Sequence, residues 1–378
     1  MKLFEYEAKK ILKEYGIPIP RGDTATNPNK AEAIAREIGK PVVLKSQILV
    51  SGRGKAGGIK FADDVGEAKQ IASDLLGRTI KGCVVTSLLV EEKLDIVEQF
   101  YTSITIDRQA KKYIVLASTS GGVDIEEVAQ TSPDKIARHW IEPSAGFNQS
   151  DALAMLSRFH LNKDTATKLA DTISTLSQVV MECDAELVEL NPLVRTSSSE
   201  LVAADSRIII DDNAIFRHAE FKERSLLRTD DTPSEAKARK QGLAYVDLDG
   251  DIGIVGNGAG LVMATIDLVQ TMGGRPGNFL DIGGGGNTEI TKMGIMLVMS
   301  KPEVKAVLVN VLGGITRCDV VAEAIARALK ESKTKKPVVV RLIGTNEEEG
   351  VRILEQAGIK SYRDMEEAVS EVIKIRGE

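Results

Sequence analysis

The chain has 378 residues, of which 43% are hydrophobic and 28% are charged, a composition typical of globular proteins long enough for two or three domains. Its net charge of −6 argues against a general attraction to nucleic acid or to anionic membranes, so any phosphate binding must come from local sites. Three widely spaced cysteines without a C-x-x-C pair argue against a disulfide framework and against a zinc site, and they favour a reducing cytoplasm.

Residues 1–16, MKLFEYEAKKILKEYG, lack the uninterrupted apolar core of a signal peptide, and no segment is long and apolar enough to predict a membrane span. The segment instead predicts an amphipathic helix closed by Gly16. The apolar residues expected on one side of this helix are Leu3, Phe4, Ala8, Ile11 and Leu12.

A lysine and a glycine-rich loop follow the first apolar strand, in PVVLKSQILVSGRGKAGGIKF (residues 41–61). Lys45 lies inside the apolar strand and must keep its charge solvated or paired, which a bound phosphate would do. The alternative is a lysine that reaches solvent from the strand end. The loop after it could fold over phosphates as a flap, although the order of lysine and glycines is not that of a P-loop. The two features together favour a nucleotide.

Two hairpins are expected in the middle of the chain. Residues 100–119 predict a hairpin that turns at 108–112, and residues 185–205 predict another that turns at the serines. Glu189 and Asn191 share one face of a strand, and the second hairpin brings Asp205 level with Leu190 or Asn191. Amide, carboxylate and phosphate oxygens suit Mg²⁺, so this hairpin is a candidate metal site; a polar hairpin end facing solvent is the alternative.

From Asp251 onward, apolar strands and amphipathic helices alternate strictly, which predicts a parallel, doubly wound sheet. The first part of the chain is mixed, of the α+β kind. The polar segment 221–242 separates the two parts, and we expect a boundary near Ser234, with domains 1–236 and 237–378.

Three glycine turns follow successive strands of the second part: GNGAGL (256–261), DIGGGGN (281–287) and NVLGGIT (310–316). The carboxyl edge of an open parallel sheet binds ligands, and a helix that begins straight after Gly313 and Gly314 would direct N–H groups at an anion. Glycines that only permit tight turns are the alternative. None of the turns matches the dinucleotide fingerprint.

Five segments together resemble the β subunits of succinate–CoA ligases (succinyl-CoA synthetases) of the ADP-forming type, and the similarity spans essentially the whole chain. The segments are LFEYEAKKILKEYGIPIP, KSQILVSGRGKAGGIK, STSGGVDIEEVAQTSP, VELNPLV and NGAGLVMATIDLV…NFLDIGGGG…VLVNVLGGITRCDVVAEAI. The resemblance implies an ATP-grasp domain followed by a flavodoxin-like CoA-ligase domain. It also implies an enzyme of the tricarboxylic acid cycle that uses ATP or ADP with Mg²⁺ and needs an α subunit, which carries a phosphohistidine and most of the CoA site.

The same resemblance implies a role for each matching residue. Lys45, Gly52, Arg53, Gly54, Glu91, Leu94 and Gln99 match the nucleotide site; Asn191 and Asp205 match the Mg²⁺ site; Glu189 matches the glutamate that receives the phosphohistidine; Asn257, Gly314, Ile315 and Thr316 match the acyl and phosphate site. The chain's own histidines, His139, His160 and His218, are far in sequence from Gly314. The resemblance implies that the anion expected at that turn is a phosphohistidine of the α subunit, which fits the absence of a histidine near the turn in the sequence.

Three features bear on specificity. Gln99 stands where relatives often carry a glutamate, ADSR (204–207) replaces the usual LDGK, and Pro20 resembles ATP-preferring relatives. The implied reaction is the reversible conversion of succinate, CoA and ATP to succinyl-CoA, ADP and phosphate. A malate–CoA ligase β subunit and a non-catalytic nucleotide-binding partner subunit are the alternatives.

Overall fold

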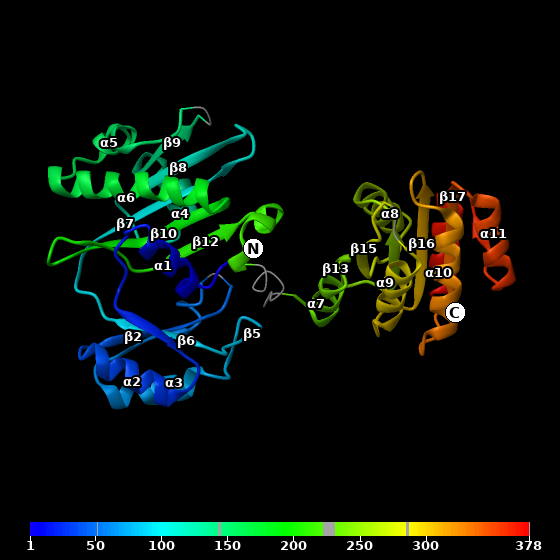
Figure 1. Ribbon diagram of the computed structural model, residues 1–378, viewed down its shortest axis with the longest axis horizontal. Helices are drawn as coiled ribbons and strands as arrows, with labels where there is room; N and C mark the ends of the chain where they lie inside the picture. The colour runs from blue at the N-terminus through cyan, green and yellow to red at the C-terminus, as the bar shows by residue number, and fades with distance from the viewer. Residues whose placement is uncertain (51, 143–144, 222–230, 285–286, 378) are drawn as a thin grey trace. The chain divides into compact units, whose positions relative to one another are not determined.

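The structure, a computed structural model, describes residues 1–50, 52–142, 145–221, 231–284 and 287–377. The chain forms two compact units, Met1–Ser225 and Leu226–Glu378 (Figure 1). The boundary expected between 236 and 237 falls inside helix α7 (Pro233–Lys240), which packs against strand β13 (Ala244–Asp247) of the second unit. Residues 222–230 of the polar segment expected to separate the domains lie outside the described residues.

The first unit contains a four-stranded antiparallel sheet in the order β1-β6-β2-β3. Helices α2 and α3 pack against each other on one face of it (Figure 1), where small buried residues such as Ala35 and Ala72 let them approach closely. The elements are β1 (Gly22–Ala25), α2 (Pro28–Ile38), β2 (Val42–Ser46), β3 (Ile59–Ala62), α3 (Val65–Leu75) and β6 (Leu88–Glu92), with a small hairpin of β4 (Thr79–Ile80) and β5 (Cys83–Val84).

A second sheet of the same unit has the order β11-β10-β7-β8-β9, with β12 also paired to β10. Both expected hairpins are confirmed: Asp107 pairs with Lys112, and Arg195 pairs with Leu201. The elements are β7 (Ile96–Asp107), β8 (Lys112–Ser118), α4 (Ile125–Thr131), η1 (Pro133–Lys135), β9 (Ile136–Ile141), α5 (Gln149–Leu156), η2 (Ser157–Phe159), α6 (Lys163–Glu182), β10 (Ala185–Thr196), β11 (Leu201–Ala203), β12 (Ser206–Ile210), η3 (Asp212–Arg217) and η4 (Ala219–Phe221).

The N-terminal helix α1 (Glu5–Glu14) is confirmed, and it packs against β12. At its start the Glu7 carboxylate accepts a hydrogen bond of 2.7 Å from the Phe4 backbone N–H, and Gly16 ends the turn after it with φ +81°. Its apolar stripe joins the large core under the second sheet, which α6 also covers. Two charged residues of α1, Glu5 and Lys9, are also buried.

The second unit contains the expected doubly wound sheet, in the order β13-β15-β14-β16-β17-β18. Alternate residues of β16 face opposite cores: Val307 and Val309 pack with α9, α10 and α11, whereas Leu308 packs with α8 and α12. The elements are β14 (Ile252–Gly256), α8 (Ala259–Thr271), β15 (Asn278–Asp281), α9 (Thr288–Ser300), β16 (Ala306–Gly313), α10 (Cys318–Glu331), β17 (Val338–Gly344), α11 (Glu347–Gln356), β18 (Ser361–Tyr362) and α12 (Met365–Ile375).

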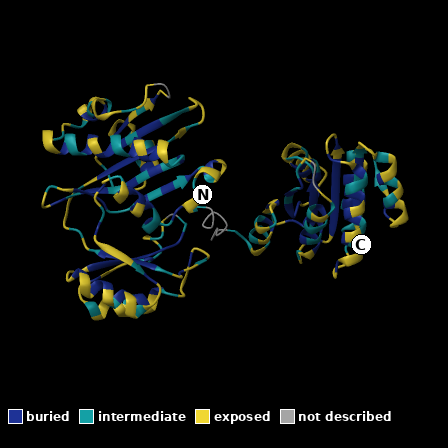
Figure 2. Ribbon diagram, viewed as in Figure 1, coloured by how far each residue is buried: buried dark blue, intermediate teal, exposed yellow. Residues whose placement is uncertain are grey.

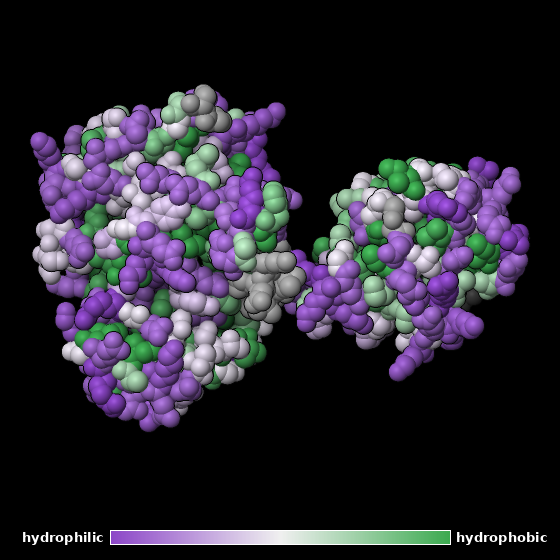
Figure 3. All heavy atoms as spheres, in the orientation of Figure 1, coloured by the Kyte–Doolittle hydropathy of each residue, from purple (hydrophilic) through white to green (hydrophobic). Residues whose placement is uncertain are grey.

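The strands of both units are largely buried and the outer faces of the helices are exposed, as Figure 2 shows. Hydrophilic residues cover most of the visible face of each unit, interrupted by small hydrophobic areas (Figure 3). Among the described residues, no helix is both long enough and apolar enough to cross a bilayer.

Candidate functional site

A cleft of about 590 Å³ in the first unit is lined by the glycine loop after β2, the start of α1 and the end of the β10 hairpin. These segments lie far apart in the sequence and meet only in the folded unit. The predicted site residues that line it are Gly52, Arg53, Gly54, Glu189, Asn191 and Asp205. The structure therefore brings the expected phosphate loop and the expected metal ligands to one place.

Lys45 lies at the end of β2, buried behind the wall of this cleft. Its ammonium nitrogen donates to Glu5 Oε1 at 2.7 Å and to the Ala204 carbonyl at 2.5 Å, and it lies 2.9 Å from Glu91 Oε2. The ammonium group is thus surrounded by three protein oxygens, two of which accept hydrogen bonds from it. The charge that the sequence predicts for phosphate binding is therefore held by protein oxygens.

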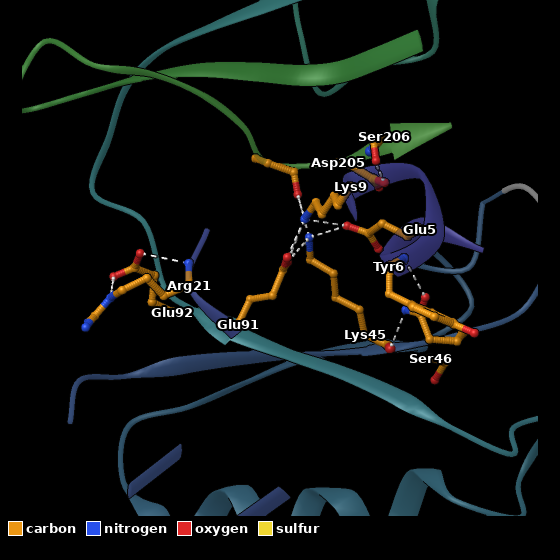
Figure 4. A network of polar contacts seen from close by, with 12 residues as sticks. Glu5, Tyr6, Lys9, Arg21, Lys45, Ser46, Glu91, Glu92, Asp205 and Ser206 are labelled. Atoms are coloured by element: carbon orange, nitrogen blue, oxygen red, sulfur yellow. Dashed lines mark hydrogen bonds and ion pairs between the residues drawn. The ribbon is translucent and has the colours of Figure 1, made fainter. Parts of the chain in front are cut away.

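Helix α1 contributes Glu5 and Lys9, which the sequence analysis did not single out. Both side chains are buried, at 1% and 2% exposure, and Figure 4 shows the ammonium groups of Lys9 and Lys45 side by side between Glu5 and Glu91. Lys9 Nζ lies 2.6 Å from Glu91 Oε1, 2.8 Å from Glu5 Oε1 and 2.8 Å from the Ala204 carbonyl. The sequence feature that could have predicted this pair is the four-residue spacing of Glu5 and Lys9 beside the apolar residues of the helix, since such a spacing places two side chains next to each other.

Arg53 completes this cluster from the glycine loop. Its guanidinium is paired with Glu5, lies 3.4 Å from Asp205 Oδ1, and donates to the Ser46 carbonyl at 3.2 Å. Burial alone would raise the pKa of the Glu5 carboxyl, but the surrounding cations, led by Lys45, hold that pKa well below its usual value. Three cations and three carboxylates thus balance: Lys9, Lys45 and Arg53 against Glu5, Glu91 and Asp205.

Asn191 and Asp205 are neighbours, as the hairpin register predicts: the Asn191 N–H donates to the Asp205 carbonyl at 3.3 Å. The Asn191 side-chain oxygen accepts from the Gly122 N–H at 2.7 Å, and its amide donates to the Val123 carbonyl at 3.0 Å. Burial, and then the charge of Glu5, raises the pKa of the Asp205 carboxyl. A carbonyl oxygen keeps a second lone pair, so both side chains can offer oxygen to a cation in the cleft.

Glu189 lies two residues before Asn191 on the same strand and also lines the cleft. The Tyr101 hydroxyl donates to its carboxylate at 3.3 Å, and Arg207 lies opposite it on β12. Burial raises the pKa of Glu189 above its usual value, whereas the Arg207 charge and the Tyr101 hydrogen bond oppose that rise.

Three further predicted residues do not line the cleft. Glu91 is fully buried on β6, where it pairs with Lys9 and Lys45. Leu94 is half-buried in the connection between β6 and β7, and Gln99 is exposed on β7. The Gln99 carbonyl accepts from the Gly121 N–H at 3.1 Å, so the strand carrying Gln99 contacts the loop that also holds Asn191.

In the second unit, the three glycine turns lie at one edge, because β15, β14 and β16 are adjacent. Asn257 ties two of them together: its amide donates to the Leu312 carbonyl at 2.9 Å and to the Thr316 hydroxyl at 3.3 Å. Asp281 accepts from the N–H groups of Gly258 at 2.6 Å and Gly283 at 2.7 Å. Gly285 and Gly286 of the second turn lie outside the described residues.

The expectation that a helix begins straight after Gly314 is wrong. Helix α10 begins at Cys318, and the Cys318 N–H donates to the Thr345 carbonyl at 2.9 Å. The segment between them carries Ile315, which is 85% exposed, and Thr316, which is buried. Ile315 is therefore the residue of this turn that is exposed, and the first N–H of the helix already has a backbone partner.

Comparisons with known proteins agree with this arrangement. Residues 2–195 match the ATP-grasp domain family, and residues 255–375 match the CoA-ligase family. The chain is 46% identical to the succinate–CoA ligase (ADP-forming) subunit beta of Pyrobaculum aerophilum, over 99% of each chain. This chain belongs to the succinate–CoA ligase β-subunit family. The resemblance inferred from the sequence is confirmed, and so is the order of an ATP-grasp domain followed by a CoA-ligase domain.

Other relatives within the succinate–CoA ligase β-subunit family differ in their named nucleotide. The chain is 47% identical to the ADP-forming subunit beta of Desulfurococcus amylolyticus, and 45% identical to the GDP-forming subunit beta of Thermus thermophilus, in both cases over at least 99% of each chain. The structure of ATP citrate lyase from Methanothrix soehngenii, in complex with citrate and coenzyme A, shares the fold with a TM-score of 0.77 at 19% identity, over 99% of each chain.

Proposed function

We propose that this chain is the β subunit of a succinate–CoA ligase, which reversibly converts succinate, CoA and ATP to succinyl-CoA, ADP and phosphate. The reaction passes through an acyl phosphate and a phosphohistidine carried by an α subunit. The observation that carries the proposal is the cleft in which a glycine loop, its arginine and a Glu–Asn–Asp set converge, in a chain of this family.

The cleft of the first unit binds the nucleotide. Gly52 has φ +71°, so the loop takes a backbone conformation that a side chain would strain, and its N–H groups can approach phosphates closely. Lys45 and Arg53 supply positive charge, which stabilises a transferring phosphoryl group. We assign the base and ribose side to Glu91, Leu94 and Gln99. Pro20 favours ATP over GTP.

Mg²⁺ is held by Asn191 and Asp205, whose oxygens fit a cation that keeps several waters and takes few protein ligands. When bound, the ion neutralises charge on the phosphates of the nucleotide. Asn191 is oriented for this by the loop after β8, through its bonds to Gly122 and Val123. Asp205 is oriented by the Ser206 N–H, which donates to its Oδ1 at 2.8 Å.

Glu189 receives the partner's phosphohistidine beside the nucleotide. The chain's own histidines are engaged elsewhere: His139 packs on Phe147, His218 pairs with Asp184, and His160 ends the short η2 helix. A histidine carrier supplied by an α subunit accounts for a nucleotide site lined by no histidine among the described residues. Asn257, Gly314, Ile315 and Thr316 contact the acyl and phosphate groups that the α subunit presents with CoA.

The three cysteines, Cys83, Cys183 and Cys318, are free thiols, which supports placing the enzyme in a reducing cytoplasm.

Binding and turnover by the purified chain, with and without its α subunit, test this function. The chain alone should bind Mg·ADP in a calorimeter and form no succinyl-CoA, whereas the complex should form it. Robust thioester formation by the chain alone would overturn the two-subunit reaction. A panel of acids tests the acid specificity, because a preference for malate over succinate would replace the proposed substrate.

A further inference from the structure

We propose that Glu5 is a built-in competitor for the phosphates of the nucleotide, which holds Lys45 and Arg53 and releases them when nucleotide binds, and that Lys9 limits the strength of this competition. The inference rests on the proposed nucleotide site of the first unit. It gives helix α1 a role in setting nucleotide affinity.

The donors of Lys45 carry the first step. Glu5 and the Ala204 carbonyl accept hydrogen bonds from Lys45, and Glu91 forms an ion pair with it at 2.9 Å, so a phosphate must displace one of these oxygens to contact Lys45 closely. The Ala204 carbonyl is part of the backbone, and Glu91 does not line the cleft, whereas Glu5 does. Glu5 is the remaining acceptor.

The position of Glu5 carries the second step. Glu5 lines the cleft together with Arg53 and Asp205, whereas Lys45 and Glu91 lie behind it. Its two carboxylate oxygens divide between Lys45 on one side and Arg53 on the other. A phosphate oxygen that enters the cleft meets Arg53 directly and can reach Lys45 only at the place that Glu5 occupies, so carboxylate and phosphate compete for the two cations.

Lys9 carries the third step. It lies one helical turn after Glu5 and contacts both Glu5 and Glu91, so it shares their negative charge. When Glu5 leaves Lys45 and Arg53, Lys9 still offers it a cationic partner 2.8 Å away, and the carboxylate does not become an unpaired buried charge. Lys9 thereby lowers the cost of the exchange.

Charge neutralisation on α1 tests the exchange, with Mg·ADP as the probe and the full chain in a calorimeter. Glu5→Gln removes the competitor and should tighten Mg·ADP binding by about tenfold, the difference between a charged and a neutral hydrogen-bond partner. Lys9→Gln leaves Glu5 and Glu91 with only Lys45 and Arg53 as cationic partners, so Glu5 should hold these two more strongly and Mg·ADP should bind more weakly. The two substitutions should therefore change the affinity for Mg·ADP in opposite directions. A purely structural role of the cluster would predict weaker binding by both variants.

A charge-balanced variant serves as the control for loss of folding. The double variant Glu5→Gln/Lys9→Gln leaves Lys45 and Arg53 against Glu91 and Asp205, so it should melt near the parent temperature and bind Mg·ADP more tightly than the parent. Glu14→Gln, at an exposed position of the same helix, is the matched control and should change neither.

The outcomes separate the inference from the function on which it rests. A parent chain that binds no Mg·ADP overturns the proposed function. A parent that binds it, with equal or weaker binding by both Glu5→Gln and the double variant, overturns the competition. Failure of the double variant to fold also overturns it, because the neutral cluster is expected to be stable without the pair.

Discussion

Substitution of Gly314 by valine tests whether the loop after β16 contacts the travelling phosphate. A Cβ at position 314 would have no atom of the described residues within 4 Å, and Gly314 is not among the glycines with positive φ. The backbone bonds of Gly314, from its N–H to the Leu312 carbonyl at 3.2 Å and from the Thr345 hydroxyl to its carbonyl at 2.9 Å, need not change. The stability change should stay within about 0.5 kcal/mol, as for other exposed substitutions.

The functional loss should be much larger than the loss of stability. If the N–H of Ile315, the exposed residue of this loop, donates to the phosphate, a valine side chain at position 314 keeps the phosphate from reaching it. Loss of one such donor costs about 2.7–4 kcal/mol, or about 100- to 1,000-fold in rate. The melting temperature should fall by no more than about 2 °C, since 1 kcal/mol shifts a unit of this size by about 2–4 °C.

Gly313→Val is the contrasting variant. A Cβ at Gly313 would lie 2.5 Å from the Thr316 carbonyl oxygen and 3.1 Å from Cys318 Sγ, so the turn must shift. Overpacking of this kind costs about 1–3 kcal/mol. Gly313→Val should therefore lower the melting temperature clearly, and it provides the reference for a loss of function that is caused by misfolding of this turn.

The assay measures phosphorylation of the α-subunit histidine by inorganic phosphate and succinyl-CoA, with nucleotide omitted, so that only the step assigned to the second unit is observed. Nucleotide binding by Gly314→Val should match the parent, because the nucleotide site belongs to the first unit. Parent-like phosphorylation by a well-folded Gly314→Val complex would refute the assignment of residues 314–316.

Three further results are expected. Asp205→Asn should slow nucleotide-dependent phosphorylation of the partner by about 10- to 100-fold at low Mg²⁺, and a parent-like rate there would show the metal assignment to be wrong. Tyr101→Phe removes a hydrogen bond that lowers the pKa of Glu189, so the acid limb of the nucleotide-dependent rate should move to higher pH; an unmoved limb would contradict a role for the Glu189 carboxylate. Because the folded-state pKa of Glu5 is depressed, its stabilisation is fully present above the pKa of an unfolded glutamate, about 4.3, and is lost progressively as the pH falls from there through the folded-state pKa. Urea melts at pH 7 and pH 4 should therefore differ less for Glu5→Gln than for the parent, and an equal difference would argue against the charged cluster.

Local patterns account for much of the site. The period of two in residues 185–205, with serines at the turn, is enough to predict that Asp205 lies beside Asn191, because a hairpin register follows from its turn. The glycine turns of the second unit share an edge because parallel strands end on the same side of a sheet. Such features depend on neighbours in the sequence or on a rule of sheet geometry.

The start of α10 shows where local patterns fail. Its sequence allows a helix from Gly314 onward, but the Thr345 carbonyl takes the Cys318 N–H and the Thr345 N–H donates to the Gly313 carbonyl, so the end of β17 fixes the intervening loop. Strand β13 was likewise not expected, since its antiparallel pairing with β15 breaks the strict alternation of the domain.

The sequence by itself determined the two kinds of domain, the glycine loop after Lys45 and the hairpin that brings Asp205 beside Asn191, because each is encoded by residues close together in the chain. Only the tertiary structure decided that Glu5 of α1 pairs with Lys45 and that Lys9 of α1 pairs with Glu91. The partners that α1 meets in that cluster are 40 to 195 residues away, and their meeting depends on how α1 and both sheets of the first unit pack. A buried charge is stable only beside such partners, so the charge balance of the site is a property of packing that no local pattern records.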